Sequence, residues 1–331
     1  MIVFLVTPPH YYTLKAVEKA LPRVVRVIDY HEFFAADRLL GGTYIFCDLE
    51  RLSEHELRIA AEAYRQLAAQ AGVRALNDPA RALTRYALLR ALFEAGINDF
   101  DVYRADALPK PRRFPVFVRW EPGHDKPSEL LHDQTALDAA LAELVVKGEP
   151  LRGMLVTEYA AEPVIPGVFR RHATFRIADE FQLFAPSSER DWRVKYGERG
   201  LVSEDIYLDD ERAMQENRFG ETLRRTFEIA GVEYGRADFG LVGGKLQIYE
   251  INTNPSVGVP APHDSPARTR ALARCWSWYL EKIAALDTAT CARKIKIDSP
   301  LLSLYRSALT TKYRTLFGWR LPRGDRLIRR P

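Results

Sequence analysis

The sequence has little cysteine and no long apolar run. Its 331 residues include three cysteines, Cys47, Cys275 and Cys291, which are far apart and have no metal-ligand spacing. This pattern argues against a disulfide framework and a cysteine zinc site, and predicts buried, reduced thiols. No apolar run approaches the roughly eighteen residues needed to span a bilayer. The first residues, MIVFLVTPPHYY, lack a basic flank and a small-residue cleavage site, so we expect a first core strand and a cytoplasmic protein.

Two familiar catalytic signatures are also absent. No glycine-rich GxGxxG follows a strand-like run in the first hundred residues, so a dinucleotide fold of the usual kind would lack its phosphate loop. No Ser-His-Asp or Cys-His arrangement has a recognisable context, and the seven histidines are scattered. The sequence therefore argues against a nicotinamide-dependent enzyme and against a hydrolase with a nucleophilic side chain.

Positive charge is concentrated at the carboxyl end. The chain carries a net +4, but from Arg293 onward eleven Lys or Arg face Asp298 and Asp325, a net +9 that leaves −5 for residues 1–292. Apolar residues between Leu301 and Trp319 accompany this charge. Two interpretations stay open: an amphipathic helix packed on its own protein, or a weak contact with an anionic surface. No nucleic-acid-binding motif is present, and the sequence gives no indication of oligomeric state.

The order of strand-like and helix-like segments predicts the fold class. A chain of this length is expected to form two or three domains. Strand-like runs and amphipathic segments alternate over the first hundred residues, which predicts a parallel sheet with helices on both faces; Ser53 with Glu56 opens the longest helix. Residues 114–197 instead hold β-rich runs separated by Gly, Pro and charge, as in antiparallel hairpins with one face toward a cleft.

The segment 236-RADFGLVGGKLQIYEINTNPSVG-258 places acids and amides in two strand-like runs. Glu250 and Asn252 are two residues apart and project from one face of a strand, because side chains alternate. The turn before that strand would bring Asp238 beside them. The sequence thus predicts three converging oxygen donors with no basic residue adjacent in the motif to neutralise them.

Two carboxylates and an amide on one partly buried face are costly unless a cation joins them, and a small set of oxygen ligands suits Mg²⁺, which keeps waters and takes phosphate oxygens. The alternative is a solvated hairpin face with both acids in water. The segment resembles the closing metal-binding motif of the ATP-grasp superfamily, in which an acid on one strand precedes Glu-x-Asn on the next. Weaker likenesses occur in the superfamily's order over most of the chain: 77–97, PVFVR, LVTEYA and HATFRIADEF.

The resemblance implies an α/β (α+β) ATP-grasp fold. It would have an amino-terminal parallel-sheet domain over residues 1–105 and an ATP-grasp domain over 106–285. Central (about 114–160) and carboxyl-terminal (about 161–285) subdomains would clasp the nucleotide, followed by the basic tail, 286–331. It also implies ATP as the cofactor with Mg²⁺, for which Mn²⁺ could substitute.

Site residues follow from the same resemblance. The metal ligands would be Asp238, Glu250 and Asn252, and the cations at the transferred phosphate would be Arg176, Lys195 and Arg193. Nucleotide contacts would come from main-chain groups of Glu158 and Tyr159, from Glu162 at the ribose, and from Arg85, Arg119, Lys126 and Ser128 at the phosphates. Two features depart from the pattern: Arg85 and Arg119 stand where the superfamily usually has lysine, and the phosphate loop, GHDKPSE, has one glycine.

The implied activity is an ADP-forming ligase. A carboxylate of a small molecule or peptide attacks the γ-phosphate of ATP, and an amine, thiol or similar nucleophile then displaces phosphate from the acyl phosphate. Two other classes stay open: a kinase on the same scaffold, and a nucleotide-binding protein without turnover.

Overall fold

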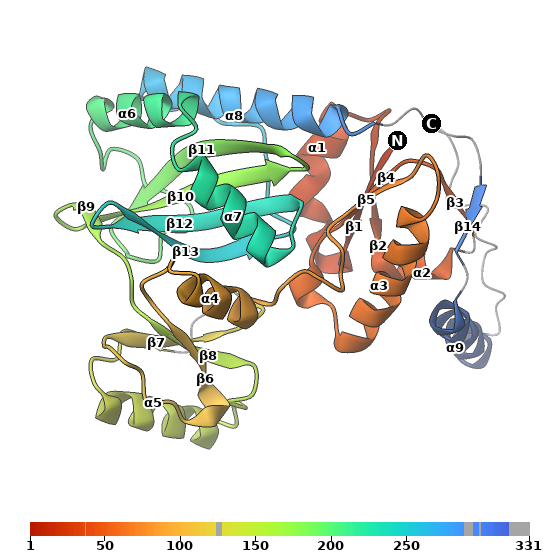
Figure 1. Ribbon diagram of the computed structural model, residues 1–331, viewed down its shortest axis with the longest axis horizontal. Helices are drawn as coiled ribbons and strands as arrows, with labels where there is room; N and C mark the ends of the chain where they lie inside the picture. Colours follow the sequence, from red (N-terminus) through yellow and green to blue (C-terminus); the bar gives the residue numbers. More distant parts are fainter. Residues whose placement is uncertain (37, 124–127, 288–293, 298, 318–331) are drawn as a thin grey trace.

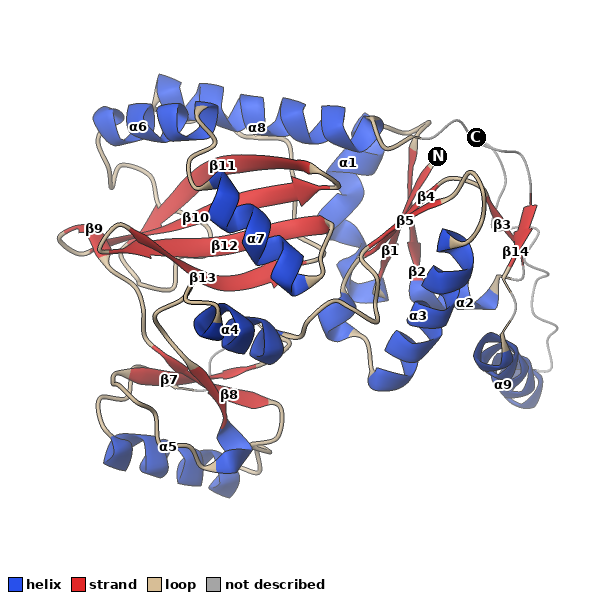
Figure 2. Ribbon diagram, in the orientation of Figure 1, coloured by secondary structure: helices blue, strands red, loops and turns tan. Residues whose placement is uncertain are grey.

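The computed structural model describes residues 1–36, 38–123, 128–287, 294–297 and 299–317, with the backbone alone from 310 to 317. Its elements form three groups, each built on a main sheet, and a further two-stranded sheet belongs to the first group (Figures 1 and 2). The fold class expected from the sequence is confirmed: a parallel sheet comes first, and two antiparallel α+β units follow. None of the described helices combines the length and the apolar character needed to cross a membrane.

The first group is a parallel sheet in the order β2-β1-β4-β5. Alternate residues of β1 pack into hydrophobic clusters on opposite faces, as expected for a sheet covered by helices on both sides. Ser53 and Glu56 form the predicted capping box at the start of α3. The elements are β1 (Ile2–Val6), η1 (Pro8–Leu14), α1 (Lys15–Ala20), β2 (Val25–Asp29), α2 (Tyr30–Ala35), β3 (Arg38–Leu40), β4 (Thr43–Phe46), η2 (Leu49–Arg51), α3 (Glu54–Ala68) and β5 (Arg74–Leu76).

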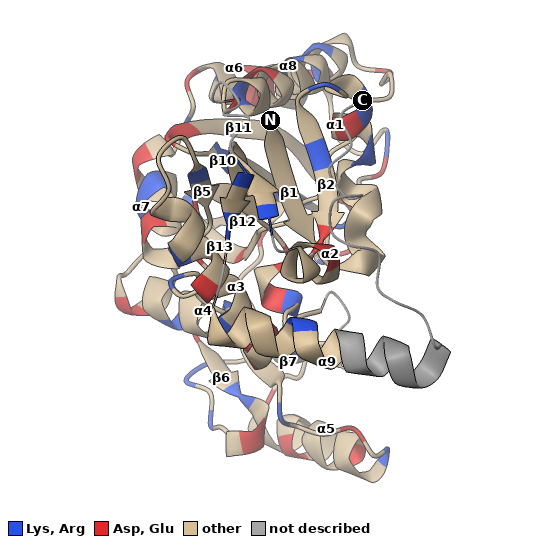
Figure 3. Cartoon of the chain, turned by 90° about the vertical axis from the view of Figure 1, so that its right-hand side faces the viewer, with Lys and Arg blue, Asp and Glu red and all other residues tan. Residues whose placement is uncertain are grey.

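The carboxyl-terminal segment returns to this first group. β14 (Lys294–Lys296) pairs with β3, and α9 (Pro300–Phe317) lies against α2 (Figure 3). Leu302 is fully buried there, the Tyr305 ring packs edge-on against Phe34, and Arg306 donates to the Phe34 carbonyl. The first turns of α9 therefore pack on their own protein. Most of the basic residues of the tail lie outside the described residues.

The second group is a small antiparallel sheet, β6-β8-β7, covered by one helix. Leu137, Leu141 and Leu144 of α5 meet Val116 and Val118 in a core of their own. Its elements are β6 (Val102–Arg104), η3 (Ala105–Ala107), β7 (Val116–Trp120), α5 (Gln134–Val146) and β8 (Met154–Glu158).

The third group is a larger antiparallel sheet, β11-β10-β12-β13, with β9 pairing to β10. Helices pack against it, and α4, which precedes the second group in sequence, lies between the two antiparallel sheets (Figure 1). The elements are α4 (Arg85–Glu94), β9 (Pro163–Ile165), β10 (Val168–Ile177), β11 (Glu180–Glu189), α6 (Glu204–Gln215), α7 (Gly220–Ala230), β12 (Tyr234–Val242), β13 (Lys245–Asn252) and α8 (Pro266–Ala284).

One buried amide joins the first and third groups. Asn77 donates to the carbonyls of Phe46 and Tyr234, at 3.0 and 2.8 Å, and its side-chain oxygen accepts from the N–H groups of Glu233 and Tyr234, both at 2.8 Å. An asparagine satisfied in this way stabilises a buried junction that an apolar residue would leave with unpaired backbone groups. It fixes how the parallel sheet meets the strands that carry the acidic motif.

Candidate nucleotide-binding site

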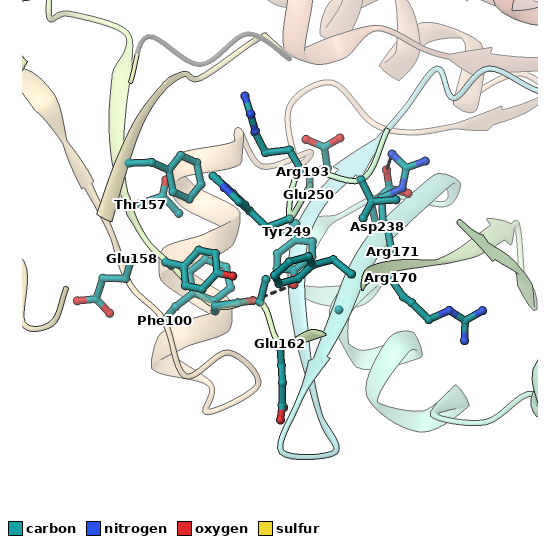
Figure 4. Close-up of a pocket in the computed structure, with 18 of the residues that line it drawn as sticks. Phe100, Thr157, Glu158, Glu162, Arg170, Arg171, Arg193, Asp238, Tyr249 and Glu250 are labelled. Carbon is teal, nitrogen blue, oxygen red and sulfur yellow. Dashed lines mark hydrogen bonds and ion pairs between the residues drawn. The ribbon is translucent and has the colours of Figure 1, made fainter. Parts of the chain in front are cut away.

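A pocket of about 530 Å³ lies between the two antiparallel sheets, within the size range of small-molecule sites (Figure 4). Strands β7 and β8 form one wall, and β10, β12 and β13 form the other. The segment between β11 and α6 contributes residues 192–195. The pocket has an aromatic end and a charged end.

The aromatic end is assembled from several elements. The Trp192 ring lies 4.9 Å from that of Phe117 and 5.3 Å from that of Tyr159, measured between centroids. Tyr249 packs against Phe100, and its hydroxyl donates to the Ala160 carbonyl at 2.8 Å. That hydroxyl passes over Gly240, where any Cβ atom would overlap it. These rings contact one another, and the faces that they turn to the pocket can stack on a planar ring such as a nucleobase.

Two acids meet at the charged end. Asp238 on β12 pairs in register with Glu250 on β13, and a bulge follows immediately. Asn252 is opposite Arg236 in the same ladder, so all four side chains share one face of the sheet. Asp238 is buried, and both carboxylates line the pocket.

Arginines neutralise both acids. Arg236 donates two hydrogen bonds to Asp238, at 2.6 and 2.8 Å, and Arg171 lies 3.5 Å from the same carboxylate. Glu250 accepts from Arg85 and, at 3.3 Å, from Arg119. The expectation of an acidic face without basic neighbours is therefore wrong. Arg236 is two residues before Asp238 and shares its face, while the other arginines arrive from α4, β7 and β10.

Positive charge exceeds negative charge around Glu250. Burial, together with the neighbouring charge of Arg85, lowers the pKa of Arg119 to about 10. The Nε atoms of both arginines are buried without a hydrogen-bond partner. Two neighbouring guanidinium cations with unpaired N–H groups are suited to an anionic ligand with several oxygens, such as a polyphosphate.

The donor set fits Mg²⁺. Asp238, Glu250 and Asn252 offer only oxygen ligands, which this cation prefers. Within the described ranges, no three or more His, Cys, Asp or Glu residues gather in one metal-binding group. A cation held here would therefore take its remaining ligands from water or from a phosphate, as Mg²⁺ commonly does.

The structure brings most of the sequence-predicted residues to this pocket, but not all of them. Arg85 and Asn252 instead line a small adjoining cavity. The Ser128 hydroxyl accepts from the Val118 N–H and donates to the Glu129 carbonyl, away from the pocket wall. Lys126 lies outside the described residues. The predicted residues that line the pocket are Arg119, Glu158, Tyr159, Glu162, Arg193, Lys195, Asp238 and Glu250.

Several of these residues are oriented toward the pocket differently from what the sequence predicted. The Glu158 side chain points away, toward Arg113 and Tyr103 (Figure 4). The N–H groups of Glu158 and Tyr159 already donate to the carbonyls of Asp101 and Pro115, so these two donors are not available to a ligand.

Two further side chains are already engaged, and a third is exposed. Glu162 accepts from the Gly243 N–H at 2.6 Å. Arg193 bonds to Asp191, and Lys195 is exposed in a segment of bends rather than in an extended strand. Both still line the pocket, so cations remain available at its rim.

Arg176 is the clearest departure. It does not line the pocket; its guanidinium donates to the carbonyls of Ala178 and Val232, at 2.8 and 2.9 Å. The reason is that the side chains of β10 alternate between the two faces of the sheet. Ala173 is opposite Asp238, and Arg176, three residues later, belongs to the other face. Arg171 is on the same face as Asp238, and Figure 4 shows the two side chains beside each other.

Sequence reasoning missed several residues of this site, among them Arg171, Trp192 and Arg236. Alternation counted from Asp238 could have identified Arg236. Trp192 lies in the quoted segment RDWRVKYG, but nothing local to that segment reveals that it packs against Phe117 and Tyr159.

No protein-family model matches the sequence, and no curated protein matches it. Among solved structures, the chain is similar to a D-alanine–D-alanine ligase from Helicobacter pylori (15% identity, 86% of this chain and 98% of that one, TM-score 0.47). It is also similar to such a ligase from Bacillus anthracis complexed with ATP (10% identity, 93% and 99%, TM-score 0.46). A third is a RimK domain ATP-grasp protein from Sphaerobacter thermophilus (15% identity, 86% and 97%, TM-score 0.45). At these identities and TM-scores, the three likenesses assign neither an activity nor a residue's role to this chain.

Proposed function

We propose that the protein is an ATP- and Mg²⁺-dependent ligase that joins a carboxylate to an amine, thiol or similar nucleophile through an acyl phosphate. The observation that carries the proposal is a single pocket whose aromatic end leads to two paired acids surrounded by cations. This is the polarity of a nucleotide: a planar base at one end and charged phosphates at the other. The volume of about 530 Å³ suits a ligand of that size.

The chain's own residues would position the nucleotide and neutralise the charge of its phosphates. Trp192, Tyr159 and Phe117 would hold the base and exclude water from it. Arg119 and Arg171 would offer planar donors to the phosphate oxygens as charge spreads over the transferred group. Mg²⁺, held by Asp238, Glu250 and Asn252, would add positive charge at the same phosphates.

Arg171 replaces Arg176 in the role at the terminal phosphate. It reaches Asp238 from β10 and donates to the Lys195 carbonyl at 2.9 Å, which connects the sheet to the segment carrying Arg193 and Lys195. The proposal also includes a division into residues 1–105, 106–285 and 286–331, a cytoplasmic location, and no role for nucleic acid.

A nucleotide-binding protein without turnover is the second candidate, and one observation favours it. Both acids are engaged by arginines, Asp238 by Arg236 and Glu250 by Arg85 and Arg119, so a cation must compete for them. Nucleotide binding that is tight without Mg²⁺, with no ADP formed from any acceptor, would support this candidate over a ligase.

The test is an ATP titration with and without Mg²⁺, followed by a screen of pooled carboxylates and amines for ADP formation. A ligase requires both pools for sustained ADP release, whereas a kinase gives a stable phosphorylated product from one. Asp238→Asn and Glu250→Gln should remove the Mg²⁺ dependence of ATP binding. Unchanged Mg²⁺-dependent affinity in both variants would refute the metal site.

A further inference from the structure

One segment of the chain reaches both ends of the nucleotide pocket. It covers residues 190–198, which follow β11, and four of its residues line the pocket. The Trp192 ring packs on two other rings at the aromatic end. The Lys195 carbonyl accepts from Arg171, whose guanidinium is 3.5 Å from Asp238 at the charged end. The placement of this single segment therefore affects both ends of the pocket.

No helix or strand holds this segment in place. Residues 190–203 form only bends and turns between β11 and α6, and all of them lie in the described part of the chain. Most of the side chains from 190 to 198 are exposed, and the Tyr196 side chain is 91% exposed. An irregular surface segment loses conformational entropy when it is confined to one conformation, so specific contacts must offset that loss.

One carboxylate makes such contacts. Glu189, the last residue of β11, accepts through a single oxygen, Oε1, from three successive N–H groups. The donors are Lys195, Tyr196 and Gly197, at 2.9, 2.5 and 2.6 Å. Successive N–H groups that converge in this way form a concave site for an anion. Gly197 has a φ of 90°, in the left-handed region that glycine adopts readily, which suits the turn to this convergence.

A second acid joins the two ends of the segment. The Glu198 carboxylate accepts from the Arg190 N–H at 3.1 Å, and the Glu198 N–H donates to the Ser188 carbonyl at 2.7 Å. These bonds close the base of the segment, next to β11. The three bonds to Glu189 extend further, to the residue that follows the pocket-lining Val194, and hydrogen bonds to a charged oxygen are roughly twice as strong as neutral ones.

We propose that Glu189 is a positioning residue that holds the segment 190–198 over the pocket before a nucleotide binds. Glu189 is not among the residues that line the pocket, so it acts through the segment, on the base through Trp192 and on the phosphates through Arg193 and Lys195. The inference rests on the proposed function. A segment that is already in place loses less conformational freedom on binding, which raises affinity, and it presents its cations in a fixed geometry.

Hydrogen exchange in the full chain without nucleotide tests these contacts directly. We expect the amides of residues 195–197 to be protected in the wild type, and to exchange at least about tenfold faster in Glu189→Ala, where the three N–H groups lose their acceptor. Glu180→Ala, at the exposed opposite end of β11, is the matched control and should exchange at the wild-type rate. Fast exchange in the wild type that slows only when MgATP is added would overturn the proposal.

Nucleotide affinity and turnover test the consequence. Glu189→Ala should raise the Kd of MgATP about tenfold, the effect expected for loss of the ring contact at the base. The rate of ADP formation should also fall at least tenfold, because the cations of the segment are displaced with it. Glu189→Gln keeps an oxygen acceptor but not its charge, and should fall between Glu189→Ala and the wild type. A wild-type Kd in both variants would contradict the role of Glu189.

A double variant distinguishes positioning from a general loss of stability. If Glu189 acts on the base through Trp192, adding Glu189→Ala to Trp192→Ala should change the Kd of MgATP by less than about twofold. Independent effects would instead multiply to about a hundredfold and would refute this route. The urea midpoint of Glu189→Ala should remain near that of the wild type, since the segment is exposed. If Glu189→Ala does not fold, Glu189→Gln carries the same comparison.

The wild-type protein separates the two levels of the inference. If the wild type fails to bind MgATP in equilibrium dialysis, the proposed function itself is wrong. If the wild type binds MgATP and Glu189→Ala binds it equally well, the nucleotide site stands and the role given to Glu189 is rejected.

Discussion

The two ends of the main pocket are held by different forces. At the aromatic end, Trp192, Phe117 and Tyr159 stabilise one another by ring packing. At the charged end, Asp238 and Glu250 are stabilised by arginines from three strands and a helix: Arg236, Arg171, Arg119 and Arg85. Ring packing is tolerant of small changes, whereas a buried ion network is costly when one member is lost.

This difference indicates where the protein is sensitive. Losing one ring enlarges the pocket but leaves its other walls in place, so the expected loss is in nucleotide affinity. Losing an acid leaves cations buried without a counter-charge, so the expected damage extends to stability and to chemistry. The following predictions test that contrast.

Glu250→Gln should have the largest effect, a loss of at least 100-fold in the rate of ADP formation. The variant removes a proposed metal ligand and the acid shared by Arg85 and Arg119. Breaking a buried ion pair on one side costs about 3 kcal/mol, so the free energy of unfolding should also fall. Steady-state ADP release and urea unfolding measure the two quantities.

Glu180→Gln is the matched control, because Glu180 is exposed and pairs only loosely with Lys282, at 3.5 Å. It should leave both measurements unchanged. A Glu250→Gln variant that remains folded and retains wild-type turnover would show that the charged end is structural and that catalysis occurs elsewhere.

His172 lies on the opposite face of β10 from the charged end and stacks on Phe239 at 5.3 Å. Burial, with the nearby charge of Arg170, lowers its pKa from 6.5 to about 3. Protonation therefore favours the unfolded chain, and stability is lost as pH falls below 6.5. By linkage the loss reaches about 2 kcal/mol at pH 5.

His172→Leu should abolish that part of the pH dependence. Urea unfolding at pH 7 and pH 5 should show a difference about 2 kcal/mol smaller than in the wild type. His132→Leu, at an exposed position, should retain the full difference. An unchanged slope in the His172 variant would mean that this histidine is already accessible to protons in the folded protein.

Trp192→Ala tests the aromatic end and should be milder. An aromatic pair contributes about 0.5–1.5 kcal/mol, and tenfold in affinity corresponds to about 1.4 kcal/mol. The KM of ATP should therefore rise about tenfold, with kcat within threefold. Trp192→Phe, which keeps a ring between Phe117 and Tyr159, should remain near the wild type. A collapse of kcat instead would place Trp192 at the chemistry rather than at the base.

Local sequence pattern was sufficient to predict part of this structure. Period-two alternation across a short turn predicted that Asp238 and Glu250 would face each other, and the register places them opposite one another. The capping box at Ser53 follows from contacts three residues apart. In both cases the physical cause lies within one hairpin or one helical turn.

Contacts between distant segments were not predictable in this way. The neutralising partners of Glu250 come from residues 85 and 119, and their approach depends on how α4 and β7 pack against β13. The pairing of β14 with β3 joins segments more than 250 residues apart, and neither strand is long enough to be recognised alone. Which cations meet which acids is a property of the assembled sheets, and one sequence does not encode it locally.

Arg176→Gln should have the smallest effect and sharpens the comparison along a single strand. Arg176 donates to two carbonyls near the end of β10 and faces away from the acids, so its loss should cost about 1 kcal/mol of stability. Its ADP formation should stay within twofold of wild type. Arg171→Gln, five residues earlier and on the acidic face, should lose at least tenfold in kcat/KM for ATP. If the two variants exchanged these phenotypes, the side-chain parity of β10 would be reversed in solution, and the charged end would have to be rebuilt around Arg176.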